Sequence, residues 1–154
     1  MGEIANIVDQ AKRAYEGGAW HGPALKELLA DVKADQAARR PLPGAHSIWE
    51  IALHIAAWQR VVSERAKGNR VDEPHEGDWQ KIEDLSLQAW QSALAKLDRV
   101  QQELVEQISR LDEADLQKPA AGTDYTVYYM LHGVIQHTLY HAGQIALLKK
   151  ADAS

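Results

Sequence analysis

Residues 132–150 read HGVIQHTLYHAGQIALLKK, an apolar stretch whose first ten residues contain three histidines. Four apolar positions share one face of a helix when each residue adds about 100° to the angle measured from Val127: Met130, Val134, Ile145 and Leu148. On the same wheel His141 lies at about −40° and His137 at about −80°, whereas His132 lies at about 140°. The stretch therefore predicts a long amphipathic helix with two inward histidines and one that faces away.

Helical patterns also cover most of the remaining chain. The five prolines fall outside the periodic segments, and no segment is convincing as a strand. Ser47 and Glu50 form an S-x-x-E capping box, which marks the start of one helix. The expected helices cover roughly residues 3–16, 23–32, 48–67, 82–111 and 126–150. The sequence predicts an all-α protein, an antiparallel four-helix bundle with a short extra helix, in one domain over residues 1–154.

The fourth expected helix, 82–111, is predicted to be the longest and has an apolar seam with 3-4-3-4 spacing. Gln101 is the one polar residue on this seam. A position at the rim of the bundle explains it most simply, and a side chain that reaches into a functional site is the alternative.

The composition narrows the classes of function. The net charge of −5 and the lack of a basic cluster argue against nucleic-acid binding. The chain has no cysteine, so histidine and carboxylate side chains would have to bind any metal ion. The charged N-terminal segment resembles neither a signal peptide nor a membrane span, and we expect a cytoplasmic protein that does not enter the membrane.

His137 and His141 are four residues apart, so their side chains leave the same helix face with Cβ atoms about 5–6 Å apart. This is the spacing with which two imidazoles on one helix bind one metal ion. A third ligand would come from another helix, and His54 borders the apolar face of the third one. A three-histidine metal site, a hydrogen-bonded structural cluster and unrelated histidines all remain open at this point.

The other histidines are weaker candidates. His21, His46 and His75 are expected in loops, and His46 directly precedes the helix cap at Ser47. We therefore expect no direct functional role for these three, and for His46 a role at the entry of the helix.

Two segments resemble the DinB/YfiT-like family of metal-dependent four-helix proteins. They are HSIWEIALHIAAWQRVV at 46–62 and LHGVIQHTLYHAGQIALLKK at 131–150, and the short motifs AW at 19–20 and EGDW at 76–79 fit the same pattern. The resemblance implies a bundle of DinB type, usually homodimeric, with a divalent metal ion held by His54, His137 and His141. Nickel or zinc is the expected metal, with manganese or iron as alternatives. A low-molecular-weight thiol is an implied cofactor.

Three neutral imidazoles leave coordination positions open for chemistry. We therefore expect a metal-dependent enzyme that acts on a small-molecule substrate, of the thiol S-transferase or hydrolase type; its catalytic residues are unassigned. The alternative is a non-catalytic, stress-related bundle in which the metal is structural. The polar and aromatic side chains near the expected site are Glu50, Trp58, Tyr128, Tyr140 and Gln144. Glu50 is expected to complete the helix cap and Trp58 to pack in the core. Gln144 either orients a ligand histidine or is exposed to solvent, and Tyr128 and Tyr140 can donate a hydrogen bond to a bound substrate.

Overall fold

Hydroxyl side chains fix where the three longest helices begin in this computed structural model, which describes residues 2–153. Helix α4 (Ile48–Ala66) follows Ser47, whose Oγ accepts a hydrogen bond from Glu50 N at 3.1 Å. Glu50 Oε2 accepts one from Ser47 N at 2.7 Å, so the predicted capping box is confirmed. Helix α5 (Leu87–Ser109) is capped by Ser86 and helix α6 (Val127–Asp152) by Thr126.

The remaining elements are shorter. They are α1 (Glu3–Tyr15), α2 (Leu25–Leu29), α3 (Ala34–Ala38) and the 3-10 helix η1 (Glu113–Gln117). No strand occurs in the part of the chain that the structure describes, which confirms the all-α prediction.

Two expectations about α5, its start and its rank as the longest helix, were wrong. Helix α5 begins at Leu87 instead of near Ile82, because Ser86 Oγ accepts from Ala89 N at 3.1 Å and starts the helix there. The longest helix is α6 with 26 residues, whereas α5 has 23. The short elements α3 and η1 were not predicted, since one turn of helix carries too little periodicity to be recognised.

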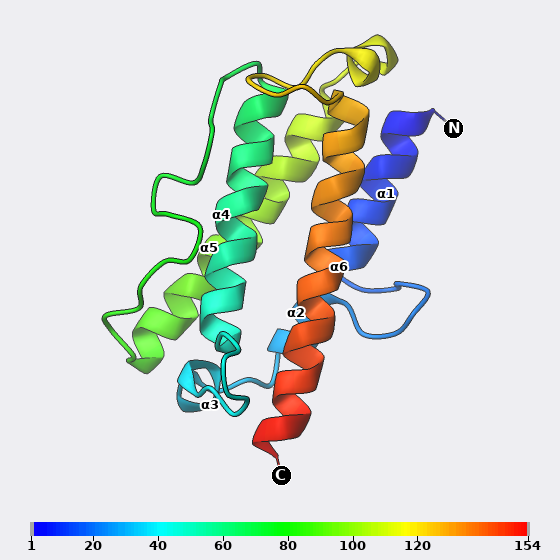
Figure 1. The fold of residues 1–154 in the computed structure, drawn as a ribbon. Helices are drawn as coiled ribbons and strands as arrows, with labels where there is room; N and C mark the ends of the chain where they lie inside the picture. Colours follow the sequence, from blue (N-terminus) through cyan, green and yellow to red (C-terminus); the bar gives the residue numbers. More distant parts are fainter. Residues whose placement is uncertain (1, 154) are drawn as a thin grey trace.

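The four long helices α1, α4, α5 and α6 lie side by side (Figure 1). Helices α4 and α5 run in the same direction. Trp49 near the start of α4 packs on Trp90 near the start of α5. Further along both helices, Gln59 is hydrogen-bonded to Gln101. Residues 67–86 connect the end of α4 to the start of α5 and return along the outside of the bundle (Figure 1). A connection of this length permits parallel neighbours. The arrangement therefore differs from a bundle in which all neighbours are antiparallel.

Helices α4 and α6 run in opposite directions. Arg65 near the end of α4 donates a hydrogen bond to Tyr125, which precedes α6, at 2.7 Å. Gln59, further back on α4, lies 3.4 Å from Thr138, which is further forward on α6. This pairing places the middle of α4, with His54, beside the middle of α6.

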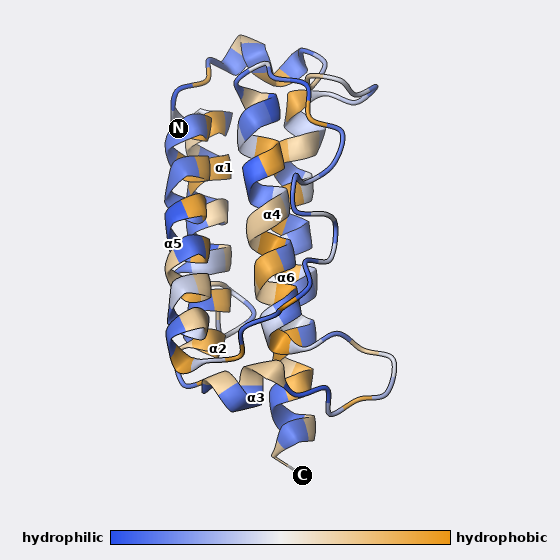
Figure 2. Cartoon of the chain, turned by 90° about the vertical axis from the view of Figure 1, so that its left-hand side faces the viewer, coloured by the Kyte–Doolittle hydropathy of each residue, from blue (hydrophilic) through white to orange (hydrophobic). Residues whose placement is uncertain are grey.

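The bundle interior consists of two apolar clusters separated by a polar layer. One cluster surrounds Trp49 and Trp90 and the other surrounds Ile7 and Leu131. Hydrophobic residues are concentrated on the inner faces of the helices and hydrophilic residues on the outer faces (Figure 2). Along α4, α5 and α6 the two clusters are separated by the polar side chains Gln59, Gln101 and Thr138.

Gln101 was expected at the rim of the bundle, but the structure places it in the interior. It is only 2% exposed, and its Oε1 accepts from Gln59 Nε2 at 2.7 Å. Its Nε2 donates to the carbonyl of Ala11 at 3.2 Å. The side chain is buried on the seam because its hydrogen bonds are satisfied by α1 and α4.

Candidate metal centre

Three histidines from two helices converge beside the polar layer. His54 Nε2 lies 3.0 Å from His137 Nε2, and His141 Nε2 lies 3.2 Å from the same atom. The ligand atoms of the three side chains all lie within 4.8 Å of one another. His54 and His141 are 6% and 5% exposed, and His137 is half-buried. The predicted split of the C-terminal histidines is therefore observed, with His137 and His141 facing His54.

The spacing of these nitrogens suits a shared metal ion. Two imidazole nitrogens at about 2.1 Å from one ion, subtending an angle of about 90–110°, are about 3.0–3.4 Å apart. The two Nε2 separations of 3.0 and 3.2 Å fall within this range. No fourth histidine, aspartate or glutamate joins the cluster within residues 2–153.

Hydrogen bonds on the far side of two rings fix which nitrogen carries the proton. His54 Nδ1 lies 2.7 Å from the carbonyl oxygen of Asp78, and His141 Nδ1 lies 2.6 Å from Gln144 Oε1. Both oxygens can only accept, so both Nδ1 atoms donate and both Nε2 atoms present a lone pair. Such orienting hydrogen bonds usually accompany metal-ligating histidines.

Without a cation, the cluster cannot satisfy all of its nitrogens. The Nε2 lone pairs of His54 and His141 both face His137 Nε2, which carries at most one proton in the neutral ring. His137 Nδ1 is buried and has no hydrogen-bond partner among the described residues. One positive ion among the three Nε2 atoms would satisfy all three lone pairs together, so the donor set fits a divalent metal.

The surroundings keep His137 and His141 neutral, which is the form that binds metals. Burial in the first place, and then the neighbouring His141 and His54, lower the pKa of His137 to about 4. Burial also lowers the pKa of His141, and the hydrogen bond to Gln144 opposes this shift in part. Both rings are therefore neutral at pH 7 and can each present a lone pair to a metal ion.

The connection between α4 and α5 covers the cluster with an aromatic ring. Trp79 stacks on His54 with ring centroids 3.9 Å apart and on His46 with centroids 3.5 Å apart. A tight turn closed by the hydrogen bond from Gly77 N to Pro74 O precedes this ring. Gly77 has φ +87°, a backbone conformation that glycine adopts without strain. The turn thus brings the Asp78 carbonyl to the Nδ1 edge of the His54 ring and the Trp79 indole to one face of it.

Sequence reasoning missed part of this site. Residues 69–80, between the expected helices 48–67 and 82–111, were expected to form a polar loop, although EGDW at 76–79 was noted as a family motif. His46 was expected to serve helix entry alone, whereas it also stacks on Trp79 and lines the cavity beside the cluster. A lone tryptophan in a polar, glycine-containing loop is the one signal that could have indicated a ring folded back onto the bundle.

A cavity of about 560 Å³ opens directly beside the histidine cluster. Its walls come from α4, α6, the loop before α4 and the loop that carries Trp79. The lining side chains apart from the three histidines are Leu42, Ala45, His46, Ile51, Asp78, Trp79, Tyr140, Gln144, Leu147 and Leu148, together with Gly44. The cluster is therefore accessible to a small molecule, and Tyr140 and Gln144 lie where they can contact it.

Glu50, Tyr128 and Trp58 do not line the histidine cavity. Glu50 completes the helix cap and pairs with Arg40. Tyr128 packs against His132 on the opposite face of α6. Trp58 is only partly buried, and its Nε1 donates to the Asp78 carboxylate at 2.7 Å, so it does not simply fill the core as expected.

His21 and His75 are exposed, and neither joins the metal-competent cluster. Their expected lack of a role at the site agrees with these positions.

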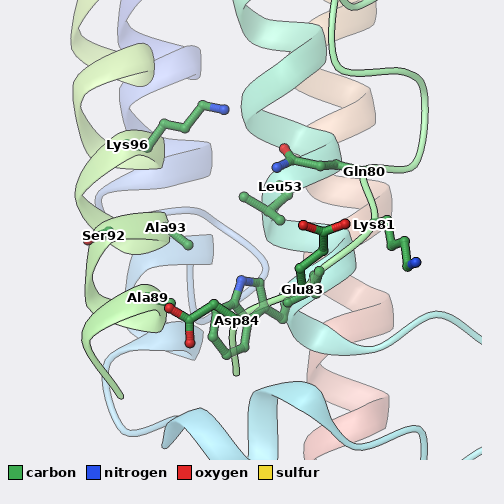
Figure 3. A pocket seen from close by; sticks show the side chains of 11 residues that line it. Leu53, Gln80, Lys81, Glu83, Asp84, Ala89, Ser92, Ala93 and Lys96 are labelled. Atoms are coloured by element: carbon green, nitrogen blue, oxygen red, sulfur yellow. The ribbon is translucent and has the colours of Figure 1, made fainter. Parts of the chain in front are cut away.

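A second cavity of about 330 Å³ lies on another side of α4, against α5 and the segment that leads into it (Figure 3). Charged side chains dominate its polar lining: Lys81, Glu83, Asp84 and Lys96. It contains no histidine, and none of the metal-competent cluster reaches it. We therefore place the candidate centre at the histidine cavity.

The fold and the site together define an all-α protein whose metal-competent histidines open onto a cavity. The model of the DinB superfamily matches residues 19–145, and the chain belongs to this superfamily. The resemblance predicted from the sequence is thereby confirmed. No curated protein and no solved structure matches the chain significantly. None of the helices in residues 2–153 is long and apolar enough to cross a membrane.

Proposed function

We propose that the chain is a metal-dependent enzyme in which His54, His137 and His141 hold one divalent ion beside a substrate cavity. One observation carries this proposal: three Nε2 lone pairs converge at the wall of a cavity of about 560 Å³. Nickel or zinc is the proposed metal, with manganese or iron as alternatives; neutral imidazole ligands suit nickel, zinc and iron in particular.

Each part of the site has a distinct task. Asp78 and Gln144 hold the His54 and His141 rings by their Nδ1 protons, so that the Nε2 atoms stay unprotonated and correctly directed. Trp79 covers one face of His54 and shields it from water. Tyr140 lines the cavity and can donate a hydrogen bond to a bound molecule. When bound, a divalent ion supplies Lewis acidity, which activates water or holds a thiol as thiolate at neutral pH.

An enzyme is favoured over a purely structural metal site because the cluster offers an open side. A structural site normally has four protein ligands, whereas this cluster has three. The reaction we propose is thiol transfer or hydrolysis on a small molecule. A thiol cofactor, a homodimer of single DinB-type bundle domains spanning residues 1–154, and a cytoplasmic location are further parts of the proposal.

Elemental analysis of protein purified without added metal tests the ligand assignment. The wild type should carry one ion per chain, and His54→Ala, His137→Ala and His141→Ala should each lose most of it. His132→Ala is the matched control, because His132 lies on the same helix but outside the cluster. Equal metal content in all five proteins would contradict the proposal.

A further inference from the structure

No lysine or arginine of residues 2–153 lines the histidine cavity, and Asp78 is the one carboxylate in this described lining. Asp78 Oδ1 already accepts a hydrogen bond from Trp58 Nε1 at 2.7 Å. The remaining walls are aliphatic or aromatic except for His46, Tyr140 and Gln144. Apart from the metal-competent cluster, the described lining therefore offers an anion no lysine or arginine charge.

Two cations on segments that border the cavity are paired with other groups. Arg40, on the loop before α4, pairs with Glu50. Lys149, at the end of α6, donates to the Leu28 carbonyl at 2.7 Å. The charged side chains that follow Trp79 line the second cavity instead, where Lys81 and Lys96 lie (Figure 3). The fold thus separates a cavity lined by lysines from one without a lysine or arginine in its described lining, on different sides of α4.

The mouth of the histidine cavity is apolar as well. Leu42, Tyr140 and Leu147 line it and are exposed to solvent, Leu147 to 59%. A carboxylate carried into such a cavity would lose its hydration without gaining a cation, and it would approach the Asp78 carboxylate. An aliphatic or aryl group would instead cover the exposed apolar side chains.

We infer that the substrate of this site carries one metal-binding group and is otherwise uncharged and largely apolar. A cavity of about 560 Å³ matches the size of sites that enclose a drug-sized molecule. Thiols and other ligands that carry several carboxylates are disfavoured. This inference rests on the proposed function, because it assumes that the metal-binding group reaches an ion held by the histidine cluster.

Thiol binding to the cobalt-loaded protein tests the inference without a known reaction. Three probes are titrated: 3-mercaptopropionate, its methyl ester and 2-phenylethanethiol. The acid and the ester share one skeleton and differ in the carboxylate charge. Sulfur-to-cobalt charge-transfer absorption reports binding, and we expect the ester and the aryl thiol to bind at least about tenfold more tightly than the acid.

A cation placed at the mouth should change this preference. Leu147→Arg should strengthen binding of the acid severalfold relative to its ester. Leu87→Arg is the matched control, because Leu87 is 61% exposed on α5 and does not line the cavity. It should leave the acid-to-ester ratio unchanged.

The outcomes separate the two proposals. If cobalt does not bind to the histidine cluster, the proposed function fails. If cobalt binds there but the acid binds as tightly as the ester, or if no thiol binds, the inference about the substrate is overturned while the metal site stands. An unchanged acid-to-ester ratio in Leu147→Arg would also overturn it.

Discussion

Replacing Gln144 by leucine should weaken metal binding although Gln144 is not itself a ligand. Gln144 Oε1 accepts a hydrogen bond from His141 Nδ1 at 2.6 Å and so keeps the proton on that nitrogen. Leucine has a similar volume but no acceptor. In Gln144→Leu the His141 ring can shift its proton to Nε2, and the lone pair that faces the cluster is then lost.

The expected loss follows from the burial of His141. Removing a partner that orients a ligating histidine typically costs about 10–100-fold in metal affinity, or about 1.4–2.7 kcal/mol. His141 is only 5% exposed, so water replaces the missing acceptor poorly. We therefore expect a loss in the upper half of this range. Gln144→Glu keeps an acceptor at the same distance and should bind metal at least as tightly as the wild type.

Competition with a chelating indicator measures these affinities for zinc at pH 7. Gln136→Leu provides the matched control, because Gln136 is exposed on the same helix and lies outside the histidine cavity. The control should bind zinc like the wild type. If Gln144→Leu and Gln136→Leu bind zinc equally well, the orienting role of Gln144 is refuted.

Three further predictions concern pH, the polar layer and the loop. The metal-free protein should lose stability as the pH falls from about 6.5 to about 4. Over this range His137 is protonated in the unfolded state, whereas burial keeps it neutral in the folded state. In thermal melts His137→Gln should weaken this dependence, and an unchanged slope would contradict its cause. Gln101→Leu should cost about 1–3 kcal/mol in chemical denaturation by leaving Gln59 without its acceptor. Adding Gln59→Leu should recover most of that loss, and strictly additive losses would argue against a coupled pair. Trp79→Ala removes the stacking on His54 and should weaken zinc binding by up to about tenfold, whereas unaltered affinity would exclude a role for the ring.

The fold was predictable where periodicity and caps were strong. Ser47 and Glu50 fixed the start of α4, and the helical phase of α6 separated His132 from its two neighbours. The parallel course of α4 and α5 was not predictable, because the segment between them shows no pattern that sets its path. The buried position of Gln101 was missed for a related reason. Whether a polar seam residue is buried depends on partners from other helices, here Ala11 and Gln59.

The three histidines of the candidate site were predictable from the sequence, but the groups that surround them were not. His137 and His141 follow from their spacing on one helix, and His54 from its place beside an apolar face. The contributions of Asp78 and Trp79 come from a loop, where neither helical phase nor strand alternation constrains direction. The Asp78 contribution is also a backbone carbonyl, which no residue type reveals.

Anomalous diffraction from crystals of the zinc-loaded protein tests the central claim most directly. Data collected above and below the zinc absorption edge locate the ion without assuming its ligands. The account predicts one strong anomalous peak per chain at about 2.0–2.1 Å from the Nε2 atoms of His54, His137 and His141. A peak bound to other side chains, or no peak within this cluster, would contradict it.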